Sequence, residues 1–444
     1  MKLAYPILIA QLIQNLMGFA DTVMAGRVSA TDMAAVAVAS SVWLPLILAI
    51  SGLIMALASI ISQLSGANQF DNIAKASYQT AWIAVFFSII IIILYYIATP
   101  LLIDSIAMEP ELKQLMFDYL GYIVWGGPGY CLYLVLRNYS EGLSFSRPTM
   151  IISILGLLIN IPANYIFIYG EFGMPALGGA GCGLATAIVY WVMFAGMLAY
   201  AYYSKHLKQA PLFTQFYWPQ WSEIKVILAL GTPIAFSLLF EVSLFAAVAI
   251  ILIPFGANVV ASHQIAINFS GLVFMVPLSL AMAVTIKVGF EVGNKNLEKA
   301  KELCRYSVIL GLIIAVATAA ATLIFKTQIA AIYTSDTEVL ELAAGLMFLA
   351  ALFQFSDAIQ VISAGALRGY KDTKSILYIT FFSYWVVGLS FGLILGLTDW
   401  IAPASGPYGF WIGFISGLTV AAVLLAWRLK VVQNRFDQQA ALAS

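Results

Sequence analysis

The stretch FEVSLFAAVAIILIPF at residues 240–255 contains a single charged residue, Glu241, in an otherwise apolar segment. The nearest charged residues along the chain are Lys225 and Lys287. A helix of this length and apolarity can cross about 30 Å of hydrocarbon. An ionised carboxylate at that depth is costly, so it normally faces a protein interior or a wet cavity. The stretch therefore predicts a membrane-spanning helix with a functional acidic residue.

The composition of the whole chain agrees with this interpretation. Its 444 residues are 62% hydrophobic and 9% charged, whereas soluble domains have about 45–50% apolar and about 25% charged residues. We therefore expect a polytopic membrane protein. The three cysteines and two histidines lie apart in the sequence and predict neither disulfides nor a metal or catalytic site; they are Cys131, Cys182, Cys304, His206 and His263.

Apolar stretches of spanning length recur along the chain, which predicts an all-α integral membrane protein with twelve transmembrane helices. The predicted spans are 4–26, 34–65, 78–103, 115–140, 149–170, 178–203, 224–255, 260–290, 303–326, 340–367, 374–397 and 407–430. With both termini in the cytoplasm, only Arg27, Lys113 and Lys326 of the 21 basic residues fall outside. This asymmetry favours that orientation, because cytoplasmic loops carry the excess of Lys and Arg.

The two halves of the sequence resemble each other. GANQFDNIAKA (66–76) matches VGNKNLEKAKE (292–302), and GLSFSRPTMIIS (142–153) matches GALRGYKDTKSIL (365–377). Pro6 and Pro233 begin the two halves, 227 residues apart. Because each half has an even number of spans, the repeat predicts two parallel six-helix lobes around a central cavity. The predicted lobes are residues 1–203 and 223–444, joined by a cytoplasmic loop at 204–222.

Small residues open the sixth span of each predicted lobe. The segments are GGAGCGLATA (178–187) and GPYGFWIGFISG (406–417). Small side chains at intervals of about three or four residues let helix backbones approach closely. We expect these segments to pack tightly against neighbouring helices.

Two further acids, Asp21 and Asp357, interrupt long apolar stretches in the same way as Glu241. A structural role for these acids would require a basic partner at matching depth. The nearest basic residues, such as Arg368 and Lys287, are predicted near cytoplasmic span ends, so none is expected there. Since all three buried groups are acidic, the ligand they predict is a cation.

Polar side chains in other spans are candidate partners for Asp21. Asn160 and Asn164 lie one helical turn apart in the fifth predicted span, and Thr186 lies in the sixth. Two amide carbonyls, a hydroxyl and a carboxylate would supply the hard oxygens that suit a sodium ion or a proton-carrying water. Two acids are interpreted differently: Glu141 is expected to pair locally with a neighbouring arginine, and Asp32 to be solvated.

Four motifs together resemble the multidrug and toxic compound extrusion (MATE) family, specifically its NorM-type branch. They are MGFADTVMAGR (17–27), INIPANY (159–165), FEVSLFAAVA (240–249) and QFSDAIQVISAGALRGYKDT (354–373). The resemblance covers essentially the whole chain. It implies a transporter, not an enzyme, that exports lipophilic organic cations in exchange for inward sodium or protons by alternating access. No cofactor is implied.

The resemblance also implies roles for particular residues. The group Asp21, Asn160, Asn164 and Thr186 matches the ion site of the amino-terminal lobe, and Glu241 and Asp357 match carboxylates of the other lobe that are tied to cation and drug binding. The chain departs from the pattern at Phe353, where relatives can carry a tyrosine, so one hydroxyl ligand is missing. The aromatic residues expected to line an apolar substrate cavity are Phe240, Phe245, Phe274, Phe353, Phe355 and Tyr384.

The expected setting is a bacterial inner membrane, with membrane lipid as the surroundings, no nucleic-acid partner and a monomeric protein.

An alternative function is a flippase for lipid-linked precursors, although its anionic substrates would call for buried arginines. An integral membrane enzyme would need a nucleophile–base pair or a metal cluster, and a passive cation channel would need a polar filter segment. The sequence contains no GxxxxGK[ST] phosphate loop, which favours an ion gradient as the energy source.

Overall fold

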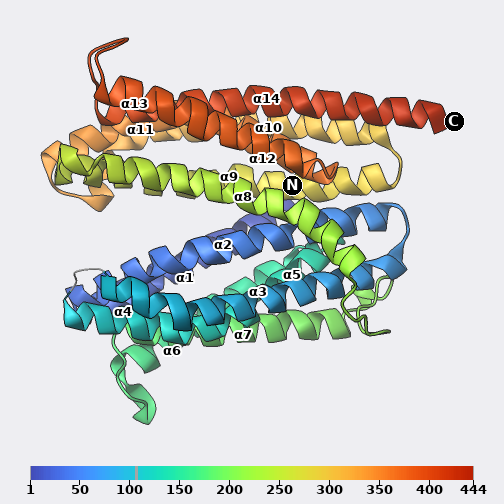
Figure 1. Cartoon of the computed structure of the whole chain (residues 1–444), viewed down its shortest axis with the longest axis horizontal. Coiled ribbons are helices and arrows are strands. Elements are labelled where there is room, and N and C mark those ends of the chain that lie inside the picture. Colours follow the sequence, from blue (N-terminus) through green and yellow to red (C-terminus); the bar gives the residue numbers. More distant parts are fainter. Residues whose placement is uncertain (1, 106–108, 444) are drawn as a thin grey trace. The chain divides into compact units, whose positions relative to one another are not determined.

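The computed structural model describes residues 2–105 and 109–443, and this part of the chain is predominantly helical (Figure 1). The ends of the two predicted lobes, Met1 and Ser444, lie outside the described residues. The first elements are α1 (Ala4–Gly26), α2 (Ala30–Gly66), α3 (Phe70–Ser105), α4 (Pro110–Ile123), α5 (Gly127–Gly142), α6 (Arg147–Tyr169) and α7 (Ala180–Tyr203). They are followed by α8 (Trp221–Ile251), α9 (Ala257–Gly293), α10 (Leu297–Tyr333), α11 (Thr337–Gly369), α12 (Thr373–Phe381), α13 (Ser390–Leu397) and α14 (Pro407–Ala443).

Within the described ranges, 11 helices are long and apolar enough to cross a membrane. The remaining predicted span, 115–140, is divided: α4 ends at Ile123, a 3₁₀ turn covers Val124–Gly126, and α5 begins at Gly127. Pro128 lies in the first turn of α5, where its missing N–H has no helical partner to lose. The interruption therefore has a local cause, and the expected all-α membrane fold is confirmed.

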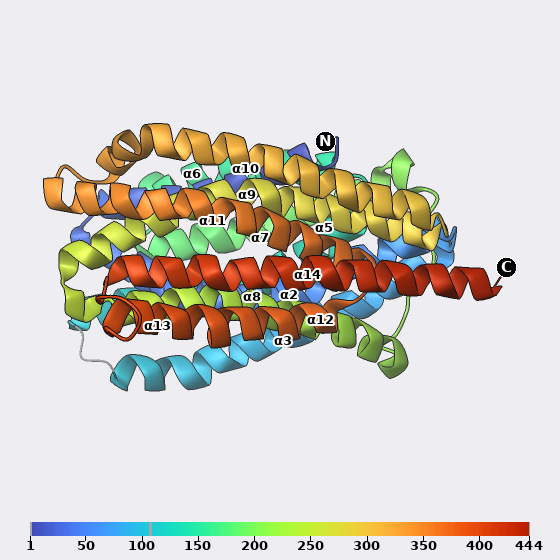
Figure 2. The ribbon, with the colours of Figure 1, turned by 90° about the horizontal axis from the view of Figure 1, so that it is seen from above.

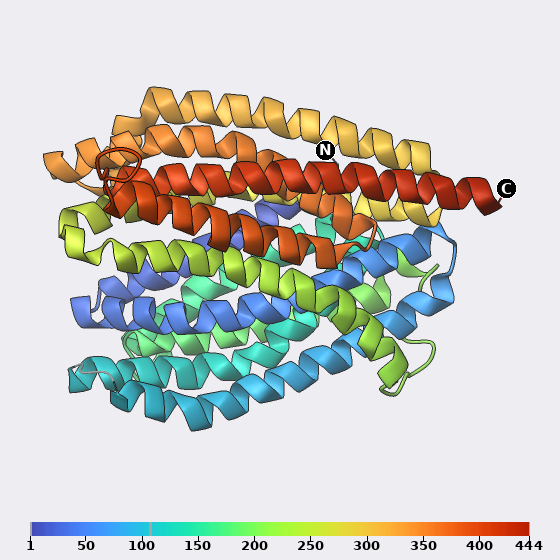
Figure 3. The same cartoon turned by 45° about the horizontal axis from the view of Figure 1, so that its top comes forward.

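The chain divides into two compact units, Lys2–Ala235 and Phe236–Ser444, and the division falls within α8. In the first unit α6 packs against α1 and α7. In the second unit α11 packs against α9, α10 and α14, and α14 lies beside α13 (Figures 2 and 3). The predicted lobe boundary at 204–222 stays a prediction.

The internal repeat is visible in the backbone of each unit. Corresponding helices end at glycines that are 227 residues apart, namely Gly66 and Gly293, and Gly142 and Gly369. Each of these ends is followed by a non-glycine residue in the left-handed region, which such residues adopt uncommonly. They are Asn68 (φ 57°), Lys295 (φ 58°), Ser144 (φ 70°) and Lys371 (φ 61°). The same offset therefore relates helix ends and turns in both units.

The predicted tight packing of the small-residue segments is confirmed. A Cβ atom added to Gly181 of α7 would lie 2.7 Å from the carbonyl oxygen of Phe167 in α6. One added to Gly413 of α14 would lie 2.6 Å from the carbonyl oxygen of Gly388, in the π-helical segment Phe382–Leu389 between α12 and α13. Only glycine allows these backbones to touch, so both contacts fix how the sixth span of each half sits in its own unit.

Candidate functional site

Asp21 of α1 is buried in the first unit, with 5% of its surface exposed. Its Oδ1 accepts hydrogen bonds from Asn164 Nδ2 at 2.6 Å and from Asn160 Nδ2 at 3.1 Å. Its Oδ2 accepts a hydrogen bond from Thr186 Oγ1 at 2.9 Å. The structure therefore brings together the four residues that the sequence grouped, from α1, α6 and α7.

The orientation of the amides differs from the expected ring of oxygens. Both asparagines present nitrogen, not oxygen, to the Asp21 carboxylate. Asn160 Oδ1 accepts a hydrogen bond from Asn164 Nδ2 at 3.2 Å, and Asn164 Oδ1 has no partner. Three donors converging on one carboxylate stabilise its ionised form. These donors offset part of the cost of burying the carboxylate, and an amide would have to rotate to offer its oxygen to a metal ion.

Asp21 has further neighbours that no sequence motif indicates, among them Cys182 and Tyr119. Cys182, one turn before Thr186 on α7, donates its Sγ–H to the backbone oxygen of Asp21 at 3.4 Å. Tyr119 of α4 interacts electrostatically with Asp21, and its hydroxyl lies 3.4 Å from Ser40 Oγ. The helical spacing of Cys182 and Thr186 was the available signal. Nothing in the sequence indicated that α4 reaches this site.

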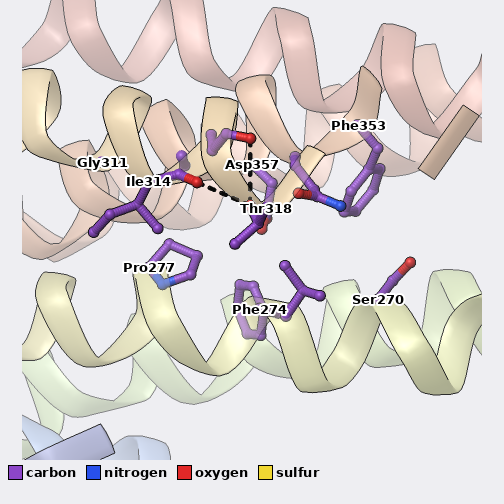
Figure 4. A pocket seen from close by; sticks show the side chains of 12 residues that line it. Ser270, Phe274, Pro277, Gly311, Ile314, Thr318, Phe353 and Asp357 are labelled. Carbon is purple, nitrogen blue, oxygen red and sulfur yellow. Dashed lines mark hydrogen bonds between the residues drawn. The ribbon is translucent and has the colours of Figure 1, made fainter. Parts of the chain in front are cut away.

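Asp357 of α11 is also buried, with 3% exposed, but its Oδ1 has no hydrogen-bond partner. It borders a narrow cavity of about 10 Å³ between α9, α10 and α11 (Figure 4), which is room for about one water molecule. Two polar atoms of lining residues, Ser270 Oγ and Gln354 Oε1, also lack partners. Phe274 and Phe353 supply aromatic walls (Figure 4). Three unpartnered oxygens belong to residues around this small space.

Glu241 of α8 lies near Asp357 within the second unit. Phe245, one turn after Glu241, packs against Phe353, one turn before Asp357, with ring centroids 6.4 Å apart. The two carboxylates interact electrostatically. Phe240, the residue before Glu241, accepts at its backbone oxygen a hydrogen bond from Trp385 Nε1 at 3.3 Å. The structure therefore brings the two acids of the second unit together.

The other aromatic candidates divide into two groups. Tyr384 is buried, its hydroxyl has no partner, and it interacts electrostatically with both acids. The Phe240 ring packs on Phe381 at 5.0 Å, beside this group. Phe355 is different: it lies two residues before Asp357, on the opposite side of α11, and does not line the cavity. Among the described residues, no three His, Cys, Asp or Glu side chains gather as a metal site would require.

The expectation that no basic residue lies near the acids is wrong for Glu241. Arg368 of α11 has 5% of its surface exposed and interacts electrostatically with Glu241. No salt bridge joins them in the described part of the chain, and Arg368 Nε and Nη1 have no partners. Arg368 belongs to the last turn of α11, but a long helical side chain leans towards the helix N-terminus. A depth predicted from the position of Arg368 at the end of its span therefore places its charge farther from Glu241 than it lies.

Two helical units that repeat at a fixed offset, with carboxylates buried inside apolar helices, define a duplicated polytopic membrane protein. The MatE family model matches residues 6–166 and 233–394, once in each half. Its two matches also begin 227 residues apart. The chain belongs to the MatE family.

Named relatives and solved structures agree with this assignment. The chain is 51% identical over 438 residues to the multidrug resistance protein MdtK of Photorhabdus laumondii, covering 99% of this chain and 96% of the relative. It is 50% identical over 433 residues to the probable multidrug resistance protein NorM of Shewanella oneidensis, covering 98% of this chain and 94% of the relative.

A crystal structure of MATE in the bent conformation matches with a TM-score of 0.89 at 21% identity, over 99% of this chain and 96% of that one. The eukaryotic MATE transporter AtDTX14 matches with a TM-score of 0.85 at 18% identity, over 99% and 97%. At these identities the structures support the fold alone.

Proposed function

We propose that this protein is a multidrug efflux transporter that exports lipophilic organic cations in exchange for sodium ions or protons. The names of relatives at 50% and 51% identity support drug export. The observation that carries the proposal is the buried Asp357 carboxylate with an unpartnered Oδ1, beside a second acid, Glu241. A buried anionic group without a donor gains free energy when a cation reaches it.

The acids of the second unit are the proposed exchange site. In a conformation that widens the small cavity beside Asp357, an organic cation would sit near Glu241 and Asp357, with Phe245 and Phe353 offering their ring faces to it. A sodium ion or proton that neutralises these acids removes the attraction that holds the organic cation. Because the same carboxylates attract both guests, binding of one favours release of the other.

Asp21 is the proposed coupling group of the first unit. Its three hydrogen-bond donors favour the charged form, so adding a proton or a sodium ion would rearrange the contacts among α1, α6 and α7. Such a rearrangement would link occupancy to the conformation of that unit. Alternating access of two lobes around a central cavity, as predicted from the repeat, would then move the substrate across the membrane.

The membrane location, the oligomeric state and the energy source belong to the same proposal. The protein would lie in a bacterial inner membrane with both termini in the cytoplasm and would act as a monomer. No resident cofactor is proposed, because the ion gradient supplies the energy.

The test is transport in proteoliposomes with sodium and pH gradients imposed separately. We expect ethidium to move against an inward gradient of at least one of these ions, and the effective gradient identifies the coupling ion. The variant Glu241→Gln/Asp357→Asn should lose this movement. Glu302→Gln, which removes an exposed acid of the second unit, is the matched control and should transport normally.

Two results would contradict the proposal. One is ethidium transport by the double variant at the wild-type rate. The other is ion flux through the wild type with no dependence on a cationic drug, which indicates a passive channel. A flippase would instead move an anionic lipid-linked precursor and leave ethidium in place.

A further inference from the structure

Arg368 is a buried charge that the proposed exchange does not use. It lies in the last turn of α11 with 5% of its surface exposed. Nε and Nη1 are buried and have no hydrogen-bond partners. A buried guanidinium with two unpartnered nitrogens is unfavourable unless nearby negative charge compensates it. The source of that compensation distinguishes the two units.

The first unit contains an arginine with a partner of its own. Arg137 of α5 is 4% exposed, and its Nε donates to Glu141 Oε1 at 2.8 Å, one helical turn away. The residues 227 positions later are Ala364 and Arg368. The second unit therefore has an alanine in place of the arginine and an arginine in place of its glutamate. Arg368 has no local acid one turn before it.

The acids of the second unit occupy positions that are uncharged in the first. Glu241 and Asp357 correspond to Gln14 and Tyr130 at the same offset. The first unit thus balances one arginine with one adjacent glutamate. The second unit places one arginine against two acids that come from other turns and another helix. Counted over these positions alone, the first set is neutral and the second carries one net negative charge.

The geometry of α11 connects Arg368 to these acids. Arg368 and Asp357 are separated by 11 residues (368 − 357), about three helical turns, so they share one face of the helix. The Arg368 side chain leans towards the turns that precede it. Gln360, with a buried and unpartnered Oε1, lies between them along the helix. Arg368 interacts electrostatically with Glu241 and with Tyr384.

We propose that Arg368 is the resident counter-charge of the Glu241–Asp357 pair and lowers the affinity of this pair for an incoming monovalent cation. It is a positioning residue, because it acts through the acids and does not itself hold the guest. A permanent positive charge nearby keeps binding weak enough for the guest to leave in every cycle. The inference rests on the proposed cation exchange and adds the group that sets its affinity.

The test measures binding of tetraphenylphosphonium, a lipophilic cation whose charge does not change with pH, to the purified full chain in detergent. Arg368→Gln should bind it about tenfold more tightly than wild type, the effect of removing one unit charge several ångströms away in a partly screened interior. Arg368→Lys keeps the charge and should bind like wild type. Arg305→Gln removes an exposed arginine of the same unit and should also bind like wild type.

A rescue experiment separates this role from a structural one. Glu241→Gln removes the acid that interacts with Arg368, so the formal charges of Asp357 and Arg368 cancel, and binding should weaken about tenfold. Adding Arg368→Gln restores one net negative charge and should return binding to near the wild-type value. Loss of an unrelated structural contact would not produce this recovery. The double variant also removes both of two interacting opposite charges, so it is expected to fold even where a single variant does not.

Three results decide the outcome. Recovery in the double variant supports the proposal. Tetraphenylphosphonium binding by wild type, with no tightening in folded Arg368→Gln and no recovery in the double variant, overturns it while leaving the proposed exchange intact. Absence of binding to wild type at millimolar concentration overturns the proposed exchange and this inference together.

Discussion

The two buried aspartates, Asp21 and Asp357, are similarly inaccessible but have opposite hydrogen-bonding environments. Asp21 receives three side-chain hydrogen bonds within its unit. Asp357 receives none from the described residues, and its Oδ1 is without a partner. Burial alone therefore does not distinguish a carboxylate that the fold has satisfied from one that still needs a positive partner. The hydrogen-bond donors around it make that distinction.

The difference indicates a division of roles between the units. Asp21 is part of the hydrogen bonding that joins α1, α6 and α7, so its carboxylate stabilises contacts within the first unit. The buried Asp357 and the half-buried Glu241 place two carboxylates in an apolar part of the second unit, and Arg368 partly compensates Glu241. A site that costs stability when empty gains most when a ligand arrives. The second unit is therefore the better candidate for direct exchange of cations.

Replacing each aspartate by leucine should give the largest contrast. Asp21→Leu leaves the donors of Asn160, Asn164 and Thr186 facing an apolar side chain, and each unsatisfied donor costs about 1–3 kcal/mol. We expect a loss of about 3–5 kcal/mol in the free energy of unfolding. Asp357→Leu removes no hydrogen bond and should leave stability unchanged or increased. Thermal unfolding in detergent measures both. Equal destabilisation by the two variants would remove the basis of the comparison.

Two threonines provide a smaller and sharper version of the same test. Thr186 donates to the Asp21 carboxylate, whereas Thr322 of α10 accepts a hydrogen bond at 3.1 Å from the neutral Gln354 and donates to the backbone oxygen of Thr318 at 2.7 Å. Hydrogen bonds to charged groups contribute about 1.5–3 kcal/mol and neutral ones about 0.5–1.5. Thr186→Val should therefore lower stability more than Thr322→Val, because only Thr186 bonds to an acidic side chain. Thermal unfolding of both variants gives the ratio. A larger loss for Thr322→Val would mean that Asp21 is not held in its charged form.

The sequence predicted those parts of the fold and site that depend on local pattern. Apolar length predicted the spans, and the small-residue segments predicted the backbone contacts seen at Gly181 and Gly413. Helical spacing placed Asn160 and Asn164 on one face, and both reach Asp21. The expected local pair of Glu141 with an arginine is confirmed by its ion pair with Arg137.

The parts that failed depend on three-dimensional contacts or on side-chain direction. The sequence groups Asp32 with the solvated loop acids, but it lies in the first turn of α2, is buried and accepts a hydrogen bond from the backbone N–H of Gly179. The amide orientation at Asp21 follows from a hydrogen-bond network that residue types alone do not specify. Arg368 was misplaced because its charge lies well away from its Cα. Each error concerns where a polar group ends up after the helices pack.

The smallest expected effect comes from Phe353, the position at which the resemblance to the NorM-type pattern implies a tyrosine. Phe353 is one turn before Asp357 and lines the same cavity. Phe353→Tyr adds a hydroxyl that can donate to Asp357 or contact a bound cation. If the hydroxyl donates a hydrogen bond to Asp357, it partly satisfies this carboxylate, as the donors around Asp21 do, and cation binding weakens. If the hydroxyl instead coordinates the bound cation, cation binding tightens. Because the cavity holds only about one water, we expect donation to prevail and tetraphenylphosphonium affinity to fall a few-fold, roughly 0.5–1 kcal/mol.

Equilibrium dialysis measures the change, with Phe355→Tyr on the opposite side of α11 as the matched control. Tighter binding by Phe353→Tyr would show that the hydroxyl serves the guest instead, and that Asp357 differs from Asp21 in the ligands it shares, not in the donors it lacks.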